Sequence, residues 1–176
     1  DHIVFNSPMQ LLRFGPGAKE AGKSVGLRIN PECSTQDGHE IYDPCAPGSR
    51  MGTTRAQWNE ASQKNPELLD LLEGIHFHTL CEQDSDDLET TLVFVKKHFG
   101  DLASRVKWIN FGGGHHITRP GYDIARLEKC IEAAKEEKLD VVLVGRGEAI
   151  LQCLKNHGIE TLPAGVEIAN ADDVVD

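Results

Sequence analysis

Three consecutive glycines, Gly112, Gly113 and Gly114, follow a short apolar segment and precede His115 and His116. Because glycine has no side chain, the backbone amides of such a run can approach an anion such as a phosphate closely. Glycine runs also occur in many ordinary turns. The segment KWINFGGGHH therefore predicts either a phosphate-binding loop or a flexible turn.

A second segment, GIHFHTLCE at residues 74–82, contains two histidines with one residue between them. Strand alternation would place His76 and His78 on the same face. One imidazole could lie against an aromatic cofactor, both could bind a metal ion, or both could be ordinary polar groups near a strand end. His115 and His116 would add metal ligands. However, no HExxH pattern or suitably spaced carboxylate accompanies them, so we expect no metal site.

A third candidate is the segment YDPCAPGSRMG at residues 42–52, which carries Ser49 and Arg50, while Arg28 lies in the preceding GLRINP. A hydroxyl and a forked cation suit a carboxylate or a phosphate. Taken singly, each side chain could equally be an ordinary surface group. The polar segment 30–54 is long for a connection that follows a strand, and such loops often form the wall of a site.

The pattern of apolar residues predicts the elements that would position these groups. We expect strands at residues 3–5, 25–29, 74–78, 106–111, 140–144 and 166–169, and helices at residues 8–20, 55–72, 86–102, 123–137 and 148–157. Asp86 and Asp87 favour a helix start, and Gly100 and Gly158 are expected to end helices in the left-handed conformation. The alternation indicates an α/β fold with a parallel sheet. Six units are too few for an eight-stranded barrel, so we expect a partial TIM-type βα barrel or an open parallel sheet.

Composition narrows the function classes. The 176 residues are 39% hydrophobic, which suits one domain, and no apolar run approaches the roughly 20 residues of a membrane span. A net charge of −10 does not suit nucleic acid. Five cysteines without a CxxC pair indicate reduced thiols, so we expect a cytoplasmic protein. From the apolar runs and the net charge, we expect neither a membrane nor a nucleic acid as a partner. The chain starts at Asp1 without a signal sequence, and we expect that its beginning is missing.

Four segments, GLRINPECS, YDPCAPGSRMG, GIHFHTLCEQ and NFGGGHHITRPGYD, occur here in the same order as in carboxynorspermidine decarboxylases. DHIVFNS also resembles a barrel strand of that family, which belongs with the alanine racemase and ornithine decarboxylase type of pyridoxal phosphate enzymes. The resemblance implies a pyridoxal 5′-phosphate cofactor, a polyamine precursor as substrate and a homodimer. The implied reaction is decarboxylation of carboxynorspermidine or carboxyspermidine in spermidine biosynthesis.

The resemblance also implies roles for individual residues. The cofactor contacts would be the glycine triplet at the phosphate, His78 stacked on the pyridine ring, Arg28 near the ring and Cys81 near the phosphate. Contacts to the substrate would come from Glu82, Ser49, Arg50 and His115. The Schiff-base lysine of the family lies upstream of Asp1, so we assign no catalytic residue within this sequence.

Two departures accompany the resemblance. The family usually has an EPGEA segment whose first Glu binds the pyridinium nitrogen, whereas Gly145 stands at that position here, and Glu148 is not assigned the missing role. In addition, residues 131–176, with LDVVLVGRGEAI and VEIANADDVV, resemble the N-terminal βαβ segment of the phosphate acyltransferase of phospholipid synthesis. We therefore expect a partial cofactor-binding barrel over residues 1–130 and a tail of separate origin that contributes packing.

Two other functions remain open. Gly145 and Gly147 lie between a predicted strand and a predicted helix, where a nucleotide-binding βαβ module has its glycines. Glu167 or Asp172 could then meet a ribose, although Ile150 replaces the third glycine. The remaining alternative is an α/β remnant without catalytic activity.

Overall fold

Six parallel strands form one sheet, and their order in the sheet follows their order in the chain. The strands are β1 (His2–Phe5), β2 (Ser24–Arg28), β3 (Gly74–His76), β4 (Trp108–Asn110), β5 (Asp140–Gly145) and β6 (Val166–Asn170). The computed structural model describes residues 1–36 and 43–170, so Tyr42 and Asp172 lie outside the described residues. A doubly wound sheet reverses its strand order, whereas a βα barrel does not. The sheet is therefore a half-barrel, which confirms the predicted partial barrel.

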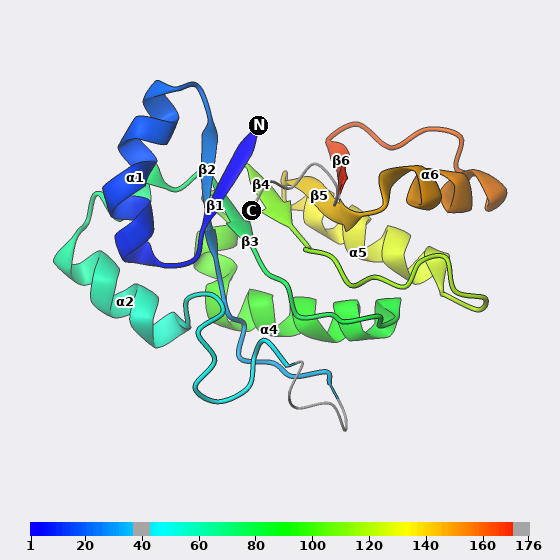
Figure 1. Ribbon diagram of the computed structural model, residues 1–176, viewed down its shortest axis with the longest axis horizontal. Helices are drawn as coiled ribbons and strands as arrows, with labels where there is room; N and C mark the ends of the chain where they lie inside the picture. The colour runs from blue at the N-terminus through cyan, green and yellow to red at the C-terminus, as the bar shows by residue number, and fades with distance from the viewer. Residues whose placement is uncertain (37–42, 171–176) are drawn as a thin grey trace.

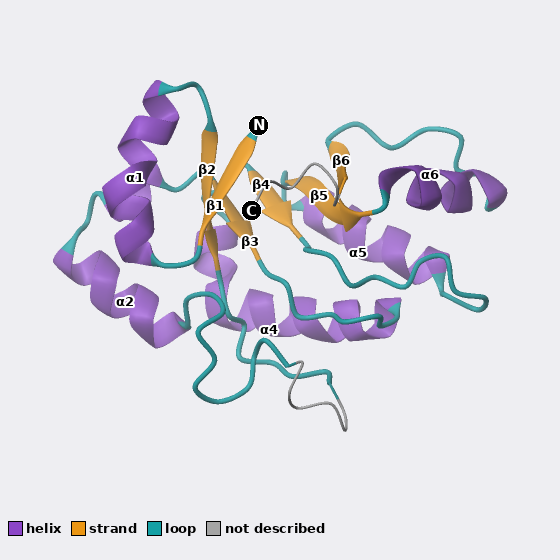
Figure 2. Ribbon diagram, in the orientation of Figure 1, coloured by secondary structure: helices purple, strands orange, loops and turns teal. Residues whose placement is uncertain are grey.

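Helices surround the central strands on the left, below and on the right in Figure 1, and Figure 2 separates the two kinds of element by colour. They are α1 (Pro8–Glu20), α2 (Arg55–Lys64), α3 (Leu68–Leu71), α4 (Ser85–Ala103), α5 (Ile124–Glu136) and α6 (Gly147–Asn156). Local caps explain several starts, because the side chains of Ser7, Thr54 and Asp123 accept hydrogen bonds from backbone amides in the first turns of α1, α2 and α5.

Two details of the predicted helices are wrong. The single helix expected over residues 55–72 is two helices, because Asn65 precedes Pro66 and has non-helical angles (φ −136°, ψ 79°). Gly100 does not take the left-handed conformation that was expected to end its helix: α4 is kinked at Phe99 (φ −132°, ψ 15°) and continues through Gly100 to Ala103. Gly158 has a φ of +86° just after α6, as predicted.

The sheet buries different residues on its two faces. One face packs apolar side chains against the helices, and this core includes Leu11, Val25, Leu27, Ile75, Leu88, Phe99, Ile109, Leu127, Val141 and Leu143. Alternation along the strands sends their other side chains to the inner face of the half-barrel. Strand register aligns Arg28 with His76, and His76 with Asn110, on this inner face. The polar candidates therefore share one side of the sheet.

Trp108 lies on the inner face, directly over two glycines. A Cβ added to Gly74 would lie 2.0 Å from the indole, and a Cβ added to Gly26 would lie 2.3 Å from it. The indole Nε1 donates a hydrogen bond to Ser24 Oγ at 2.8 Å, and the His2 ring lies 4.4 Å away between centroids. Trp108 is only 3% exposed. Glycine is needed at these two strand positions because the ring takes the place of their side chains.

Candidate functional site

The carboxyl ends of β2, β3 and β4 bring the candidate residues to one edge of the half-barrel. Arg28 is the last residue of β2, His78 follows β3 by two residues, and Gly112 follows β4 by two residues. In parallel sheets these ends face the same way, and ligands bind beyond them. The rings of His76 and His78 lie 6.4 Å apart between centroids, as the alternation predicted.

The glycine triplet forms a tight loop against the chain that leaves β3. Gly112 (φ +73°) and Gly114 (φ +83°) have left-handed angles. A Cβ at Gly112 would lie 2.5 Å from the Phe77 carbonyl oxygen, and one at Gly114 would lie 2.1 Å from the Leu80 carbonyl oxygen. A Cβ at Gly113 would approach His78 Cε1 at 3.6 Å. The loop and the His78 imidazole therefore lie side by side.

One of the three glycine amides is taken by a hydrogen bond within the loop. The Gly112 amide donates to Asn110 Oδ1 at 2.8 Å, so it is already occupied. Among the described residues, the amides of Gly113 and Gly114 have no hydrogen-bond partner. Asn110 was not among the predicted site residues, although an asparagine two positions before a glycine is a recognisable turn signal. The loop thus has two amides without a partner in the described residues, and Asn110 holds its shape.

A cavity of about 380 Å³ lies in front of this loop. Four predicted site residues besides Gly114 line it, together with residues from the long loop after β2; the full lining is Arg28, Pro44, Met51, His78, Leu80, Cys81, Glu82 and Gly114. Glu82 is exposed and has a left-handed φ of +54°. Arg28 Nη1 lies 3.4 Å from Met51 Sδ. Pro44 and Met51, from the described part of segment 30–54, form one wall of this cavity, and that the segment walls a functional site stays a prediction.

The histidines around the cavity are held in the neutral state. Burial, with the nearby Arg28 guanidinium, lowers the pKa of His76 to about 4. Burial, followed by the His78 ring, lowers the pKa of His115 to about 4. The pKa of His78 is lowered for the same reason, with Arg28 contributing. Both ring nitrogens of His115 are buried without a hydrogen-bond partner. Arg28 is therefore the positive charge of this site at neutral pH.

These low pKa values predict that the protein loses stability in mild acid. Between about pH 6.5 and pH 4, the unfolded chain binds protons at His76 and His115 that the folded chain does not bind, so the free energy of unfolding falls as the pH falls. We expect a loss of about 1–3 kcal/mol per histidine, measured by urea denaturation at several pH values. The variants His76→Asn and His115→Gln should flatten this dependence. The exposed His157→Asn should not, and equal curves for all three variants would contradict the assignment.

Ser49 and Arg50 do not line the cavity that contains His78. They face a second cavity of about 680 Å³, formed with the start of α1 and with α2. Asn6 fixes this arrangement, because its Oδ1 accepts from the Gly52 amide at 2.8 Å and its Nδ2 donates to the Arg50 carbonyl at 2.9 Å. Met51 lines the first cavity, so the two hollows are separated by one short stretch of chain.

The end of β5 approaches the glycine loop through its backbone. The Val144 amide donates to the Gly112 carbonyl at 3.0 Å, and a Cβ at Gly113 would lie 3.2 Å from the Val144 carbonyl oxygen. A Cβ at Gly145, however, would lie 2.5 Å from Ile150 Cδ1 on α6. A side chain at position 145 would therefore point toward the helices and away from the candidate site.

The nucleotide-binding interpretation gains no support from the described residues. Glu167 pairs with Val142 near the start of β6, whereas Gly145 pairs with Asn170 at its end. Three residues of strand separate these pairs by about 10 Å. Glu167 thus lies away from the start of α6, where a ribose carboxylate would be needed.

Two further findings concern the part of the chain that the structure describes. No group of three or more His, Cys, Asp or Glu side chains there could hold a metal ion. No helix there is both long and apolar enough to cross a membrane.

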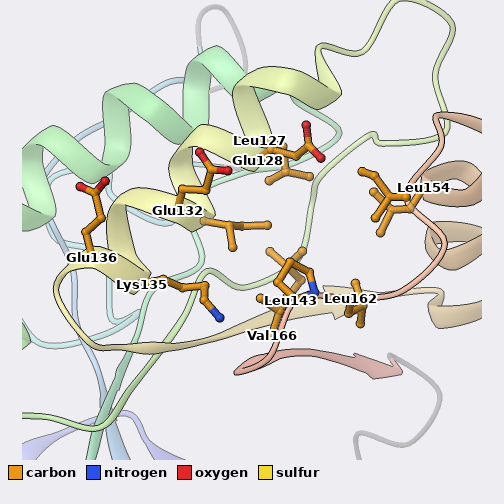
Figure 3. A pocket seen from close by; sticks show the side chains of 12 residues that line it. Leu127, Glu128, Glu132, Lys135, Glu136, Leu143, Leu154, Leu162 and Val166 are labelled. Carbon is orange, nitrogen blue, oxygen red and sulfur yellow. The ribbon is translucent and has the colours of Figure 1, made fainter.

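A third, mainly apolar cavity of about 530 Å³ lies on the helix side of the sheet, between α5, β5, α6 and β6 (Figure 3). Leu127, Leu143, Leu154 and Val166 line it from these four elements. None of the predicted site residues reaches this cavity. We therefore place the candidate site at the strand ends, where polar groups converge.

Known proteins match this chain only in part, and no family model matches it. A carboxynorspermidine/carboxyspermidine decarboxylase from Campylobacter jejuni is 39% identical over 149 residues, covering 85% of this chain and 37% of that protein. A carboxyaminopropylagmatine decarboxylase from Synechocystis sp. is 39% identical over 123 residues, covering 70% of this chain and 30% of that protein. A carboxynorspermidine/carboxyspermidine decarboxylase from Herminiimonas arsenicoxydans is 34% identical over 125 residues, covering 70% of this chain and 32% of that protein.

Solved structures give the same result. Carboxynorspermidine decarboxylase from Campylobacter jejuni, complexed with norspermidine, superposes with a TM-score of 0.64 at 37% identity, covering 81% of this chain and 34% of that one. A diaminopimelate decarboxylase has a TM-score of 0.54 at 17% identity, covering 96% of this chain and 41% of that one, which shows a shared fold. The chain thus spans about a third of the length of the relatives that it matches in sequence. In sequence and in fold, this chain corresponds to a barrel segment of the carboxynorspermidine decarboxylase family.

Proposed function

We propose that this chain forms part of the cofactor site of a pyridoxal phosphate-dependent decarboxylase that acts on carboxynorspermidine or carboxyspermidine in polyamine biosynthesis. The observation that carries the proposal is the position of His78 beside the glycine loop, at a cavity that Arg28 also lines. A planar ring with a phosphate group suits this combination of an accessible imidazole, two free amides and a cation. Side chains at positions 112 and 114 would collide with the Phe77 and Leu80 carbonyl oxygens, so glycine keeps the loop close to the chain that leaves β3.

Each residue of the site would contribute binding or orientation. The amides of Gly113 and Gly114, with Cys81 beside them, would hold the phosphate, and His78 would stack on the ring. Arg28 would supply positive charge near the ring. The bound cofactor supplies an electron-accepting ring that stabilises the charge left when carbon dioxide departs.

The substrate would be held by groups of both signs. Glu82 lines the His78 cavity, and its exposed carboxylate would attract the amino groups of a polyamine precursor. Ser49 and Arg50 would bind a carboxylate of the substrate from the neighbouring cavity, beyond Met51. Both ring nitrogens of His115 are buried and the residue does not line the His78 cavity, so it could contact the substrate only if its surroundings move. Gly145 supplies no partner for a pyridinium nitrogen, so another group would have to take that role.

The same proposal covers the cellular compartment of the protein, its oligomeric state and the origin of residues 131–176. The five cysteines are free, which supports a reducing compartment such as the cytoplasm. A homodimer is proposed from the family alone. We further propose that residues 131–176 have a separate origin and contribute packing. This proposal rests on the resemblance of LDVVLVGRGEAI and VEIANADDVV to the phosphate acyltransferase segment.

Titration of the purified chain with pyridoxal phosphate tests the proposal. We expect weak, reversible binding with a dissociation constant of about 1 mM, which can be measured through the quenching of tryptophan fluorescence. Replacing the stacked ring in His78→Ala should weaken binding roughly three- to tenfold, because an aromatic contact contributes about 0.5–1.5 kcal/mol. The matched control His157→Ala removes an exposed imidazole just after α6 and should bind as the unaltered chain does. No binding at millimolar concentrations, or equal binding by both variants, would overturn the proposal.

A further inference from the structure

Gln83 joins the glycine loop to the segment that leaves β3. Its backbone amide donates to the Gly114 carbonyl at 3.0 Å, and its carbonyl accepts from the His116 amide at 3.0 Å. These two bonds form an isolated parallel bridge between Gln83 and His115. The glycine loop is thus held at its far end by the backbone of a single residue.

The side chain of Gln83 holds a different part of the chain, the segment at residues 35–36 that follows β2. Its Nε2 donates to the Thr35 carbonyl, and its Oε1 accepts from Gln36 Nε2. The same Oε1 lies 3.2 Å from both Thr35 Oγ1 and the Cys81 amide. Gln36, only 7% exposed, also donates to the Thr79 carbonyl at 3.1 Å. Gln83 therefore contacts the loop after β2, the loop after β3 and the loop after β4.

We infer that Gln83 is a positioning residue, which couples the glycine loop to residues 30–36. Its backbone fixes one loop and its side chain fixes the other, so displacement of either segment must break bonds made by the same residue. None of residues 30–36 lines the cavity that contains His78. An anion held by the Gly113 and Gly114 amides would consequently restrain a segment that it does not touch. This effect of a bound anion rests on the proposed function. The mechanical link, by which we mean that Gln83 bonds to both the glycine loop and residues 35–36, does not.

Glutamine suits this position because its terminal amide is both a donor and an acceptor. Gln83→Met keeps the length of the side chain and removes both functions. Gln83→Glu keeps the acceptor for Thr35 Oγ1 and the Cys81 amide, but it faces the Thr35 carbonyl with a second oxygen. Gln36→Met removes the donor of the hydrogen bond from Gln36 Nε2 to Gln83 Oε1. Gln63→Met, at an exposed position of α2, is the matched control.

Hydrogen exchange without ligand tests the mechanical link. In Gln83→Met and in Gln36→Met, we expect the amides of residue 30 and residues 32–36 to exchange roughly tenfold faster than in the unaltered chain, because the side-chain hydrogen bonds that hold this segment in place are lost. Gln83→Glu should lie between these variants and the unaltered chain, and Gln63→Met should leave exchange unchanged. Exchange at 30–36 that is equal in all five proteins would overturn the inference.

Exchange with saturating pyridoxal phosphate tests the coupling. In the unaltered chain and in Gln63→Met, the cofactor should slow exchange at 30–36 severalfold, whereas in Gln83→Met it should slow exchange only near the glycine loop. Cofactor-linked protection at 30–36 that survives in Gln83→Met would refute the coupling. If the unaltered chain binds no cofactor, the proposed function fails, and the experiment without ligand alone decides whether Gln83 holds the two loops together.

Discussion

Gly114→Ala is expected to destabilise the protein by about 3–5 kcal/mol and to abolish binding of pyridoxal phosphate. The new Cβ would lie 2.1 Å from the carbonyl oxygen and 2.5 Å from the carbonyl carbon of Leu80. These are backbone atoms, so no side-chain rotation can relieve the overlap. The φ of +83° adds strain for any residue with a Cβ. The free energy of unfolding in urea and a cofactor titration measure the two effects.

Gly121→Ala is the matched control for this substitution. Gly121 has a similar φ of +87°, but a Cβ there would meet no heavy atom within 4 Å. Its cost should be limited to backbone strain, about 1 kcal/mol, with cofactor binding unchanged. If Gly114→Ala and Gly121→Ala lower the free energy of unfolding equally, then close packing against Leu80 does not explain the need for glycine at position 114.

Gly74→Ala is expected to destabilise the protein by about 3 kcal/mol or more. A Cβ at position 74 would lie 2.0 Å from Trp108 Cε2 and 2.1 Å from Cδ2. The indole would have to leave its place on the inner face and lose its hydrogen bond to Ser24 Oγ. Urea denaturation measures the loss in the free energy of unfolding. Tryptophan fluorescence reports whether the indole of Trp108 becomes exposed.

A double-mutant cycle separates this overlap from a general effect on the strand. In a Trp108→Ala background the three nearest contacts of the new Cβ disappear, so the added cost of Gly74→Ala should fall below about 1 kcal/mol. Gly100→Ala, inside α4 with Lys96 Cγ at 3.9 Å as its nearest neighbour, should be neutral or slightly stabilising. An equal cost of Gly74→Ala with and without Trp108 would contradict the proposed packing.

Local signals in the sequence predicted the elements well. The bounds of α1 agree with the expected residues 8–20, because Ser7 and Pro8 form a recognisable helix start. The long predicted helix failed at Asn65, where the effect of the following proline was overlooked. Gly100 failed for a different reason: α4 is kinked at the buried Phe99, and burial of Leu102 and Ala103 holds one further helical turn beyond Gly100.

The amino-acid sequence by itself determined the alternation of strands and helices and the common face of His76 and His78, while the order of the strands in the sheet decided between a partial barrel and other parallel sheets. These features depend on residues close together in the chain, through strand and helix periodicity. Tertiary structure decided which segments meet: Gly114 against Leu80, Gln83 between two loops, Arg50 in a separate cavity and position 145 facing α6. Such contacts depend on the register between strands and on how loops pack beyond their ends, and no local pattern encodes the partner across the sheet.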